Sequence, residues 1–263
     1  MALFEDVFNK VSIYDMLFFN IKAVLEYPTL HDLEEKNPTL FKRWKHISKS
    51  KHDVDFDVKN KAALENVYLD NAIYHPEFSR IVAITYATLY SENNTLKRFF
   101  KKIANEDEYI VISTFMDVLH QLSSEGVKST PQYFPMLCGH NVINNDLPLL
   151  LKRFILHRSK FEVNKQVPLI LKMGLNAKPW ESTVIDTINV WKFNGNNYES
   201  LMLISDFLQL KKSVELDTLS ELSKNYWDVV FAENKEKAME YVSLQSATQT
   251  NLVIQLVNEL RLL

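Results

Sequence analysis

The stretch Leu137-Cys-Gly-His-Asn-Val-Ile-Asn-Asn-Asp-Leu-Pro148 connects an apolar run to a leucine-rich helical pattern. The apolar run covers residues 133–138 and ends at a glycine, which is followed by the polar pair His140 and Asn141. Asp146 stands two residues before a proline, and proline is favoured in the first turn of a helix. We therefore predict that a buried strand delivers the Asp146 carboxylate to the start of a helix. A carboxylate presented in this way binds a divalent cation or pairs with a nearby charge.

A second polar feature interrupts an apolar strand pattern near the N-terminus. Residues 16–24 (MLFFNIKAV) are typical of a buried strand, but they include Asn20 and Lys22. Because strand side chains alternate between the two faces of a sheet, both polar residues lie on one face. Two interpretations stay open: a strand end where both side chains reach water, or the wall of a functional site.

The remaining periodicity predicts strands that alternate with helices. We predict strands at 78–90, 95–103 and 183–185, and helices at 62–72, 105–122 (with Asn105 as its N-cap), 147–156, 201–208 and 234–262. Residues 28–75 are predicted to form a helical and loop insert, with 45–57 as a solvated loop. We therefore expect residues 1–263 to form a single α/β domain. Its mixed sheet, an antiparallel hairpin plus parallel strands, is flanked by helices.

Composition excludes several classes of protein. The formal net charge of −3 gives no overall basic footprint for nucleic acid, although a local basic surface stays open. The single cysteine, Cys138, excludes an intramolecular disulfide and is typical of a reducing compartment, so we expect a cytoplasmic protein. No apolar run approaches about 20 residues, so no membrane partner is expected.

Sequence motifs exclude most common cofactor and hydrolase sites. The chain has only four glycines, and they do not form a dinucleotide-binding or phosphate-cradling motif. It also lacks HExxH, CxxC and GxSxG. The polar residues on the predicted strands are therefore the best candidates for a site.

Segments spread along the chain carry a resemblance to a known family. They are Leu17-Phe-Phe-Asn-Ile-Lys22, Glu77-Phe-Ser-Arg-Ile-Val82, Gly139-His-Asn with Asp146-Leu-Pro148, Lys178-Pro-Trp-Glu with Ile185-Asp-Thr187 and Trp191-Lys-Phe193, and Tyr241-Val-Ser-Leu-Gln245. From about Met16 to the C-terminus, the chain resembles the predicted 3′-5′ exonucleases related to the proofreading domain of family B DNA polymerases, in the DEDD superfamily. The resemblance implies a ribonuclease H-like fold.

The resemblance also implies a mechanism, for which most of the required acids are replaced here. In the family, four carboxylates hold two Mg²⁺ or Mn²⁺ ions, and a tyrosine orients the attacking water. The positions that match the first motif are Asn20 and Lys22, and Asp146 is kept in the second. Tyr241 matches the tyrosine of the third motif, but Gln245 stands where the last acid is expected. The formal charge of the set is 0 here, against −4 in the family.

A site of this charge is not expected to bind two metal ions, so no cofactor is expected. We predict instead that Lys22 takes the place of the metal and forms an ion pair with Asp146, which keeps both groups ionised. Asp186 is a second carboxylate near the matched positions. For Asp186, capping or bonding to backbone beside Trp191 is favoured over metal ligation.

These residues favour a pseudo-nuclease that binds nucleic acid or a partner without cutting. Single-stranded DNA or RNA is the expected ligand, and His140, Asn141 and Trp180 are the candidate contacts. For His140 and Asn141, bracing the loop after the strand through backbone hydrogen bonds is favoured over binding. One alternative is a residual metal-dependent 3′-5′ exonuclease that uses Asp146 and Asp186. The other is a protein-interaction module with no nucleic-acid role.

Overall fold

The computed structural model describes residues 11–52, 61–125, 135–162, 167–168, 170–171, 183–193, 195–232 and 234–262. Its centre is a five-stranded mixed sheet with strand order β3-β2-β1-β4-β5. The strands are β1 (Met16–Leu25), β2 (Ser79–Glu92), β3 (Thr95–Ala104), β4 (Met136–Gly139) and β5 (Val184–Asp186). β1, β2 and β3 pair antiparallel, while β1–β4 and β4–β5 pair parallel. The predicted α/β class is confirmed, and the topology is compatible with a ribonuclease H-like fold.

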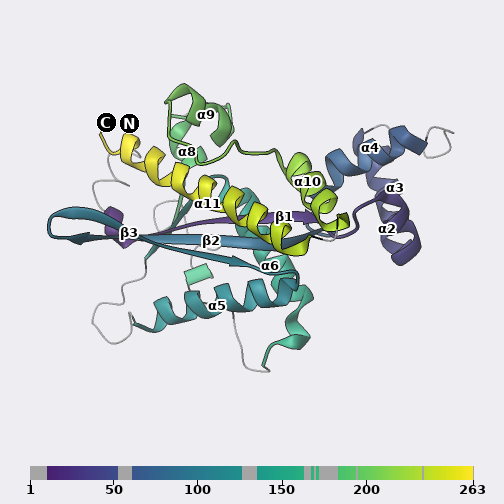
Figure 1. The fold of residues 1–263 in the computed structure, drawn as a ribbon, viewed down its shortest axis with the longest axis horizontal. Coiled ribbons are helices and arrows are strands. Elements are labelled where there is room, and N and C mark those ends of the chain that lie inside the picture. The colour runs from purple at the N-terminus through teal and green to yellow at the C-terminus, as the bar shows by residue number, and fades with distance from the viewer. Residues whose placement is uncertain are drawn as a thin grey trace.

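Helices cover both faces of this sheet (Figure 1). The helices are α2 (Leu30–Lys36), α3 (Pro38–His52), α4 (Lys61–Asn71), α5 (Glu108–Glu125), α6 (Leu147–Leu156), α8 (Thr187–Trp191), α9 (Leu201–Phe207), α10 (Leu219–Phe231) and α11 (Lys235–Leu260). α11 crosses one face of the sheet, and α5 and α6 cover the other, whereas α2, α3 and α4 project from one end (Figure 1). None of the described helices is both long and apolar enough to cross a membrane.

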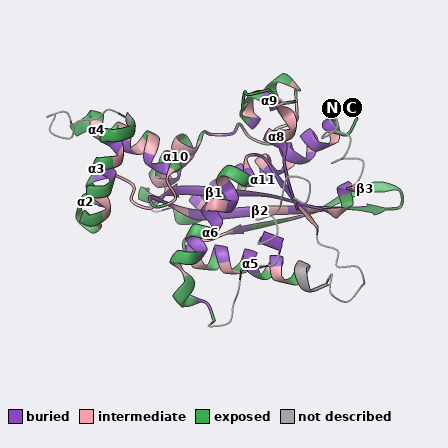
Figure 2. Cartoon of the chain, turned by 180° about the vertical axis from the view of Figure 1, so that it is seen from behind, coloured by how far each residue is buried: buried purple, intermediate pink, exposed green. Residues whose placement is uncertain are grey.

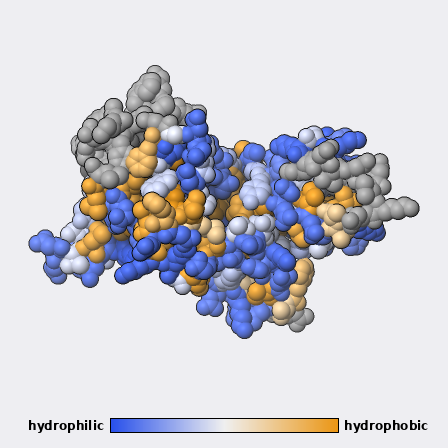
Figure 3. Space-filling model, turned by 90° about the horizontal axis from the view of Figure 1, so that it is seen from above, coloured by the Kyte–Doolittle hydropathy of each residue, from blue (hydrophilic) through white to orange (hydrophobic). Residues whose placement is uncertain are grey.

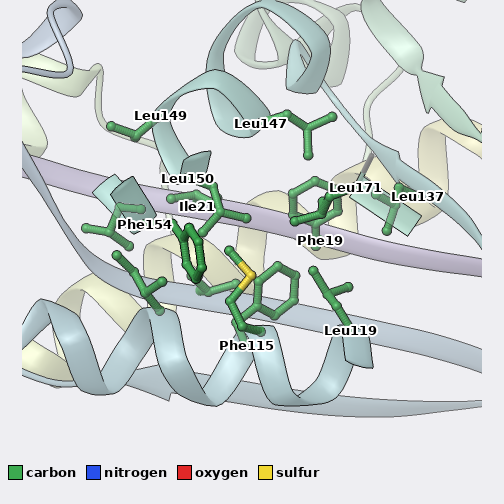
Figure 4. Packing of buried hydrophobic residues seen from close by; sticks show 14 of the residues in the cluster. Phe19, Ile21, Phe115, Leu119, Leu137, Leu147, Leu149, Leu150, Phe154 and Leu171 are labelled. Atoms are coloured by element: carbon green, nitrogen blue, oxygen red, sulfur yellow. The ribbon is translucent and has the colours of Figure 1, made fainter. Parts of the chain in front are cut away.

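The central strand β1 organises the core, because all ten of its residues are buried (Figure 2). Phe19 and Ile21 point to the face covered by α5 and α6, where they pack with Phe115, Leu150 and Phe154 (Figure 4). Strand alternation places the intervening side chains on the α11 face. There, the apolar packing is interrupted by polar groups of β1.

A buried ion network ties the α5–α6 face to the sheet. Arg153 of α6 bonds both carboxylate oxygens of Glu108, at 2.8 and 2.9 Å from Nε, and its Nη2 reaches Glu26 at 2.8 Å. Glu108 also accepts from the backbone N–H of Ile81 at 2.6 Å and contacts His157 Nε2 at 2.7 Å. Because Glu108 and Arg153 are both buried, each needs the other to compensate for its lost hydration.

The structure corrects two local predictions and adds one helix. Residues 45–52 belong to α3 rather than to a solvated loop, and 53–60 lie outside the described residues. α5 begins at Glu108, and the N–H of Tyr109 in its first turn donates to Asp107 Oδ1. Asp107, not the predicted Asn105, therefore caps the start of this helix. Finally, α10 was not predicted, although Thr218 and Glu221 form a capping box at its start.

Candidate functional site

The candidate site lies where β1, the turn after β4, and α11 meet. β4 ends at Gly139, and a single π-helical turn, Val142–Asp146, then leads directly into α6. Asn141 begins this turn with a left-handed φ of 62°, a conformation that asparagine tolerates better than most residues. A Cβ at Gly139 would lie 2.9 Å from the carbonyl oxygen of Phe19, so glycine is needed where the two strands approach. The predicted delivery of Asp146 by a strand is therefore observed.

Asp146 is held against the backbone of β1. Its Oδ2 accepts from the N–H of Ile21 at 3.3 Å, and its Oδ1 accepts from Asn145 Nδ2 at 2.9 Å. The side chain is buried, and this burial raises the pKa of Asp146 to about 7, against the opposing effects of the two hydrogen bonds and of Lys22. Near neutral pH, this carboxyl group is therefore poised between its charged and neutral forms.

Lys22 lies in the same pocket wall and is also buried. Its Nζ donates to Gln249 Oε1 at 2.5 Å. Burial lowers the pKa of Lys22 to about 8, and the negative charges of Asp146 and Asp217 oppose that shift. The ammonium group is therefore within electrostatic reach of two carboxylates.

The predicted direct ion pair between Lys22 and Asp146 is wrong. Among the described residues, no carboxylate oxygen lies within 4.0 Å of Lys22 Nζ, which bonds an amide oxygen instead. The prediction that attraction keeps both groups ionised also overlooked burial, which shifts both pKa values toward the neutral forms. The physical reason is that lost hydration outweighs the attraction between charges that are not in contact.

Tyr241 and Gln245 of α11 hold the segment before α10. Gln245 is buried, its Oε1 accepts from the N–H of Asp217 at 3.1 Å, and its Nε2 donates to the carbonyl of Glu215 at 2.9 Å. Tyr241 donates its hydroxyl hydrogen to Asp217 Oδ2, and Asn225 Nδ2 donates to the same carboxylate oxygen at 2.7 Å. Burial and this bond to Asp217 raise the pKa of Tyr241, so it stays a neutral donor.

Asp186 performs the capping role that the sequence favoured. Its Oδ1 accepts from the N–H of Asn141 at 2.6 Å and from that of Ile188 at 3.3 Å, and its Oδ2 accepts from Ile143 at 2.9 Å. The carboxylate thus caps α8 and fixes the turn that carries Asp146. Both of its oxygens are already occupied by backbone donors.

His140 is buried and braced, while Asn141 borders the pocket. His140 Nδ1 lies 2.9 Å from Thr187 Oγ1, and Nε2 lies 3.2 Å from the carbonyl of Glu199. Burial lowers the pKa of His140 to about 4, so the ring is neutral at physiological pH. Trp180, the third candidate contact, lies outside the described residues.

A pocket of about 530 Å³ is lined by Lys22, His140, Asn141, Asp146 and Asp217, among others. Its wall is rich in amides, with Asn20, Asn141, Asn144, Asn145 and Gln249 beside Lys22 and Asp146. The aromatic side chains of Tyr74 and Tyr198 also line it, and they are 58% and 59% exposed. Asn20 Oδ1 is buried without a hydrogen-bond donor, and a buried acceptor of this kind calls for a ligand or water. The pocket therefore offers unused polar capacity.

The residues present do not fit a pair of divalent ions. The cationic side chain of Lys22 occupies the pocket wall, and the pKa of Asp146 is raised. Among the described residues, no group of three or more His, Cys, Asp and Glu side chains is placed to hold a metal ion. Neutral amide oxygens alone bind Mg²⁺ poorly, because it prefers carboxylates.

No protein-family model matches the chain, and no curated protein matches it significantly.

The sequence reasoning missed two residues of the site. Asp217 lies in the coil before α10, and Gln249 lies one helical turn beyond Gln245. A signal for each was present: Asp217 directly precedes the Thr218 capping box, and Gln249 has the four-residue spacing that puts it on the same helix face as Gln245. Only the fold shows that Gln249 bonds Lys22 of β1 and that Asp217 lies within electrostatic reach of Lys22.

Proposed function

We propose that this chain has a nuclease-type fold and binds the end of a single-stranded nucleic acid without hydrolysing it. The observation that carries the proposal is the buried Lys22 ammonium, within electrostatic reach of Asp146 and Asp217 and bonded to Gln249. A fixed cation at this place opposes divalent metal. It also offers a positive charge to a phosphate, the group on which such a site would act.

The rest of the pocket supports a nucleotide ligand. Its volume of about 530 Å³ lies in the range of small-ligand sites. Exposed rings such as Tyr198 can stack on a base, and the asparagine amides supply both donors and acceptors for base edges. The unpaired Asn20 Oδ1 accepts a hydrogen bond from an amino or hydroxyl group of the ligand.

A residual exonuclease that uses Asp146 and Asp186 has less support. The Asp186 carboxylate accepts from three backbone N–H groups, as described above, and Asp186 is not among the pocket residues. Metal binding by Asp186 would break the cap of α8 and release the turn that carries Asp146.

One observation favours a protein partner as the second candidate function. The large apolar side chains Phe193, Leu203 and Phe207 are 55%, 58% and 74% exposed near α8 and α9. Figure 3 shows hydrophobic surface gathered in the half of the molecule that carries these two helices. Exposed apolar surface of this kind marks an interaction site more often than isolated residues do.

The test combines binding and cleavage. Fluorescence anisotropy with labelled single-stranded DNA and RNA at 50 and 200 mM salt measures affinity, and incubation of the same strands with Mn²⁺ measures hydrolysis. We expect salt-sensitive binding without cleavage, weakened several-fold by Tyr198→Ala. Phe231→Ala, which truncates a 61% exposed ring at the end of α10, is the matched control and leaves affinity unchanged.

Two results would overturn the proposal. Cleavage that Asp146→Ala abolishes would establish a residual nuclease. No binding at 50 mM salt would favour the protein-partner function instead.

A further inference from the structure

The hairpin of β2 and β3 forms a separate, exposed surface. β3 is the edge strand of the sheet, and residues 95–102 are exposed except for a half-buried Phe100. The hairpin turns at Asn93 and Asn94, whose φ values of 52° and 57° suit a tight two-residue turn. It projects from the end of the sheet opposite α2, α3 and α4 (Figure 1).

One face of this hairpin alternates cations with aromatic rings. Lys97, Phe99 and Lys101 share a face of β3, because strand side chains alternate. Their partners on β2 are Tyr90 opposite Lys97, Thr88 opposite Phe99 and Tyr86 opposite Lys101. The rings of Tyr86 and Phe99 lie 6.3 Å apart. Neighbours on this face of β3 are about 7 Å apart along the strand, a spacing on the scale of one nucleotide.

The charge of β3 contrasts with that of the whole chain. Its sequence, TLKRFFKKIA, contains four basic residues and no acid, whereas the protein carries a formal net charge of −3. No ion pair engages Lys97, Lys101 or Lys102 among the described residues, so their charges are available to a ligand. Arg98 on the other face bonds Asn251 of α11.

We propose that the face formed by Tyr90, Lys97, Phe99 and Lys101 binds single-stranded nucleic acid. The lysines contact phosphates, and the exposed rings stack on bases. The ligand class rests on the proposed function, but the residues are distinct from the pocket: none of the four lines it. The hairpin thus supplies affinity for longer strands in addition to a site for one strand end.

Two alternative roles for this surface fit its pattern less well. Lysines on an edge strand can serve only to prevent aggregation, but that role does not require Tyr90 and Phe99 to be 46% and 51% exposed. A membrane-inserting hairpin would gather apolar side chains at its tip, whereas this tip reads Glu92-Asn-Asn-Thr95. Alternating rings and cations suit a nucleic-acid strand better than either role.

The experiment compares two charge reversals of equal size. Lys97→Glu/Lys101→Glu reverses the charge of the two lysines on the proposed face. Lys224→Glu/Lys237→Glu, which changes two exposed lysines of α10 and α11, is the control. Anisotropy with a 20-nucleotide oligothymidylate at 50 mM salt should show at least a tenfold loss for the hairpin variant. The slope of log affinity against log salt should also fall by about 1.4 for two lost phosphate contacts. Phe99→Leu, which keeps an apolar side chain but loses the ring, should weaken binding about fivefold or more.

A mononucleotide, thymidine 5′-monophosphate, separates this proposal from the pocket. If the hairpin variant keeps mononucleotide binding but loses the long oligonucleotide, the hairpin assignment holds. If the wild type binds the oligonucleotide and both charge-reversal variants lose affinity equally, the hairpin proposal fails while the pocket proposal stands. If the wild type binds neither ligand but binds vesicles containing anionic lipid through Lys97 and Lys101, both nucleic-acid proposals fail.

Discussion

At the residue scale, Lys22 and Asp146 are buried in the wall of the same pocket, where their opposite charges attract each other. Burial lowers the pKa of Lys22 to about 8 and raises that of Asp146 to about 7. Neither group is bonded directly to the other, so small changes in the pocket shift both equilibria. A phosphate bound at Lys22 would favour the protonated lysine and also a protonated Asp146, because it adds negative charge.

The first prediction concerns stability as a function of pH. The pKa of Asp146 in the folded protein lies above its reference value of 3.8. Its contribution to the free energy of unfolding is therefore fully present below about pH 4 and is lost as pH rises through about 7. We therefore expect Asp146→Asn to gain stability relative to wild type between pH 4.5 and 7.5, by about 1–4 kcal/mol. Urea denaturation at these two pH values measures the difference. A constant difference across this range would contradict the raised pKa.

Lys22 affects stability at higher pH. Its pKa is lowered below the reference value of 10.5. The contribution of Lys22 to the free energy of unfolding is therefore present above pH 10.5 and is lost as pH falls through about 8. Together, the two groups contribute least between about pH 7 and 8. This loss of stability near neutral pH is consistent with a pocket whose charges serve binding.

The second prediction introduces acids into the pocket wall to create a metal site. Asn20→Asp combined with Lys22→Glu changes the formal charge of Asn20, Lys22, Asp146 and Gln245 from 0 to −3. Because carboxylates are the preferred ligands of Mn²⁺, the double variant should bind Mn²⁺ at least tenfold more tightly than wild type. Electron paramagnetic resonance titration of free Mn²⁺ measures this directly. Lys224→Glu, which adds an acid on α10 only, is the control, and equal affinity of the two variants would refute the assignment of the pocket.

At the element scale, hydrogen bonds from α11 hold the segment before α10 in place. Gln245 bonds the backbone of Asp217 and Glu215, and Gln255 bonds the N–H and the carbonyl of Lys211 at 2.9 Å each. These bonds hold Asp217 near Lys22. A carboxylate in place of the Gln245 amide could not donate to the carbonyl of Glu215.

The third prediction compares these two glutamines. Gln245 is buried, so Gln245→Ala leaves two backbone groups unpaired away from water and should destabilise the fold by about 2–4 kcal/mol. Gln255 is half-buried and water can replace its bonds, so Gln255→Ala should cost under about 1 kcal/mol. Thermal unfolding of both variants checks the order. Equal losses would indicate that Gln245 does not anchor the segment.

Element boundaries were predictable where a local signal ended the pattern. β1, α4, α6 and α11 lie within two residues of their predicted bounds because apolar periodicity ends at polar or breaker residues. The charge-rich stretch 45–52 was predicted as a loop, yet it continues α3 because Trp44 packs into a buried cluster with Tyr68 and Phe78. Tertiary packing of that one face outweighs the polar character of the residues beyond it.

At the scale of the whole molecule, Glu108 connects four parts of the fold. It bonds Arg153 of α6 and the backbone of Ile81 in β2, it starts α5, and through Arg153 it reaches Glu26, which directly follows β1. The face of the sheet opposite α11 therefore depends on one buried charge network, located away from the pocket.

The fourth prediction tests that network. Glu108→Gln removes a charge from a buried pair and leaves Arg153 with Glu26 alone, which should destabilise the protein by about 3–5 kcal/mol. Glu77→Gln is the control, because its ion pair with Lys152 is more than half exposed and should contribute under about 1 kcal/mol. Urea denaturation gives both values. A loss below 1 kcal/mol for Glu108→Gln would show that the network is not structural.

The grouping of Asn20, Lys22 and Asp146 was implied by the resemblance to the exonuclease family. Local periodicity and the positions of glycine and proline were sufficient to predict the α/β sheet and the polar interruptions of β1. These features depend on neighbours in the chain, where side-chain alternation and helix signals act. The partners of Lys22 could not be predicted in this way. Gln249 and Asp217 come from segments about 200 residues away, and their contacts depend on how α11 crosses the sheet. The same holds for the pKa values, because burial by distant elements outweighs the attraction between charges that the sequence makes evident.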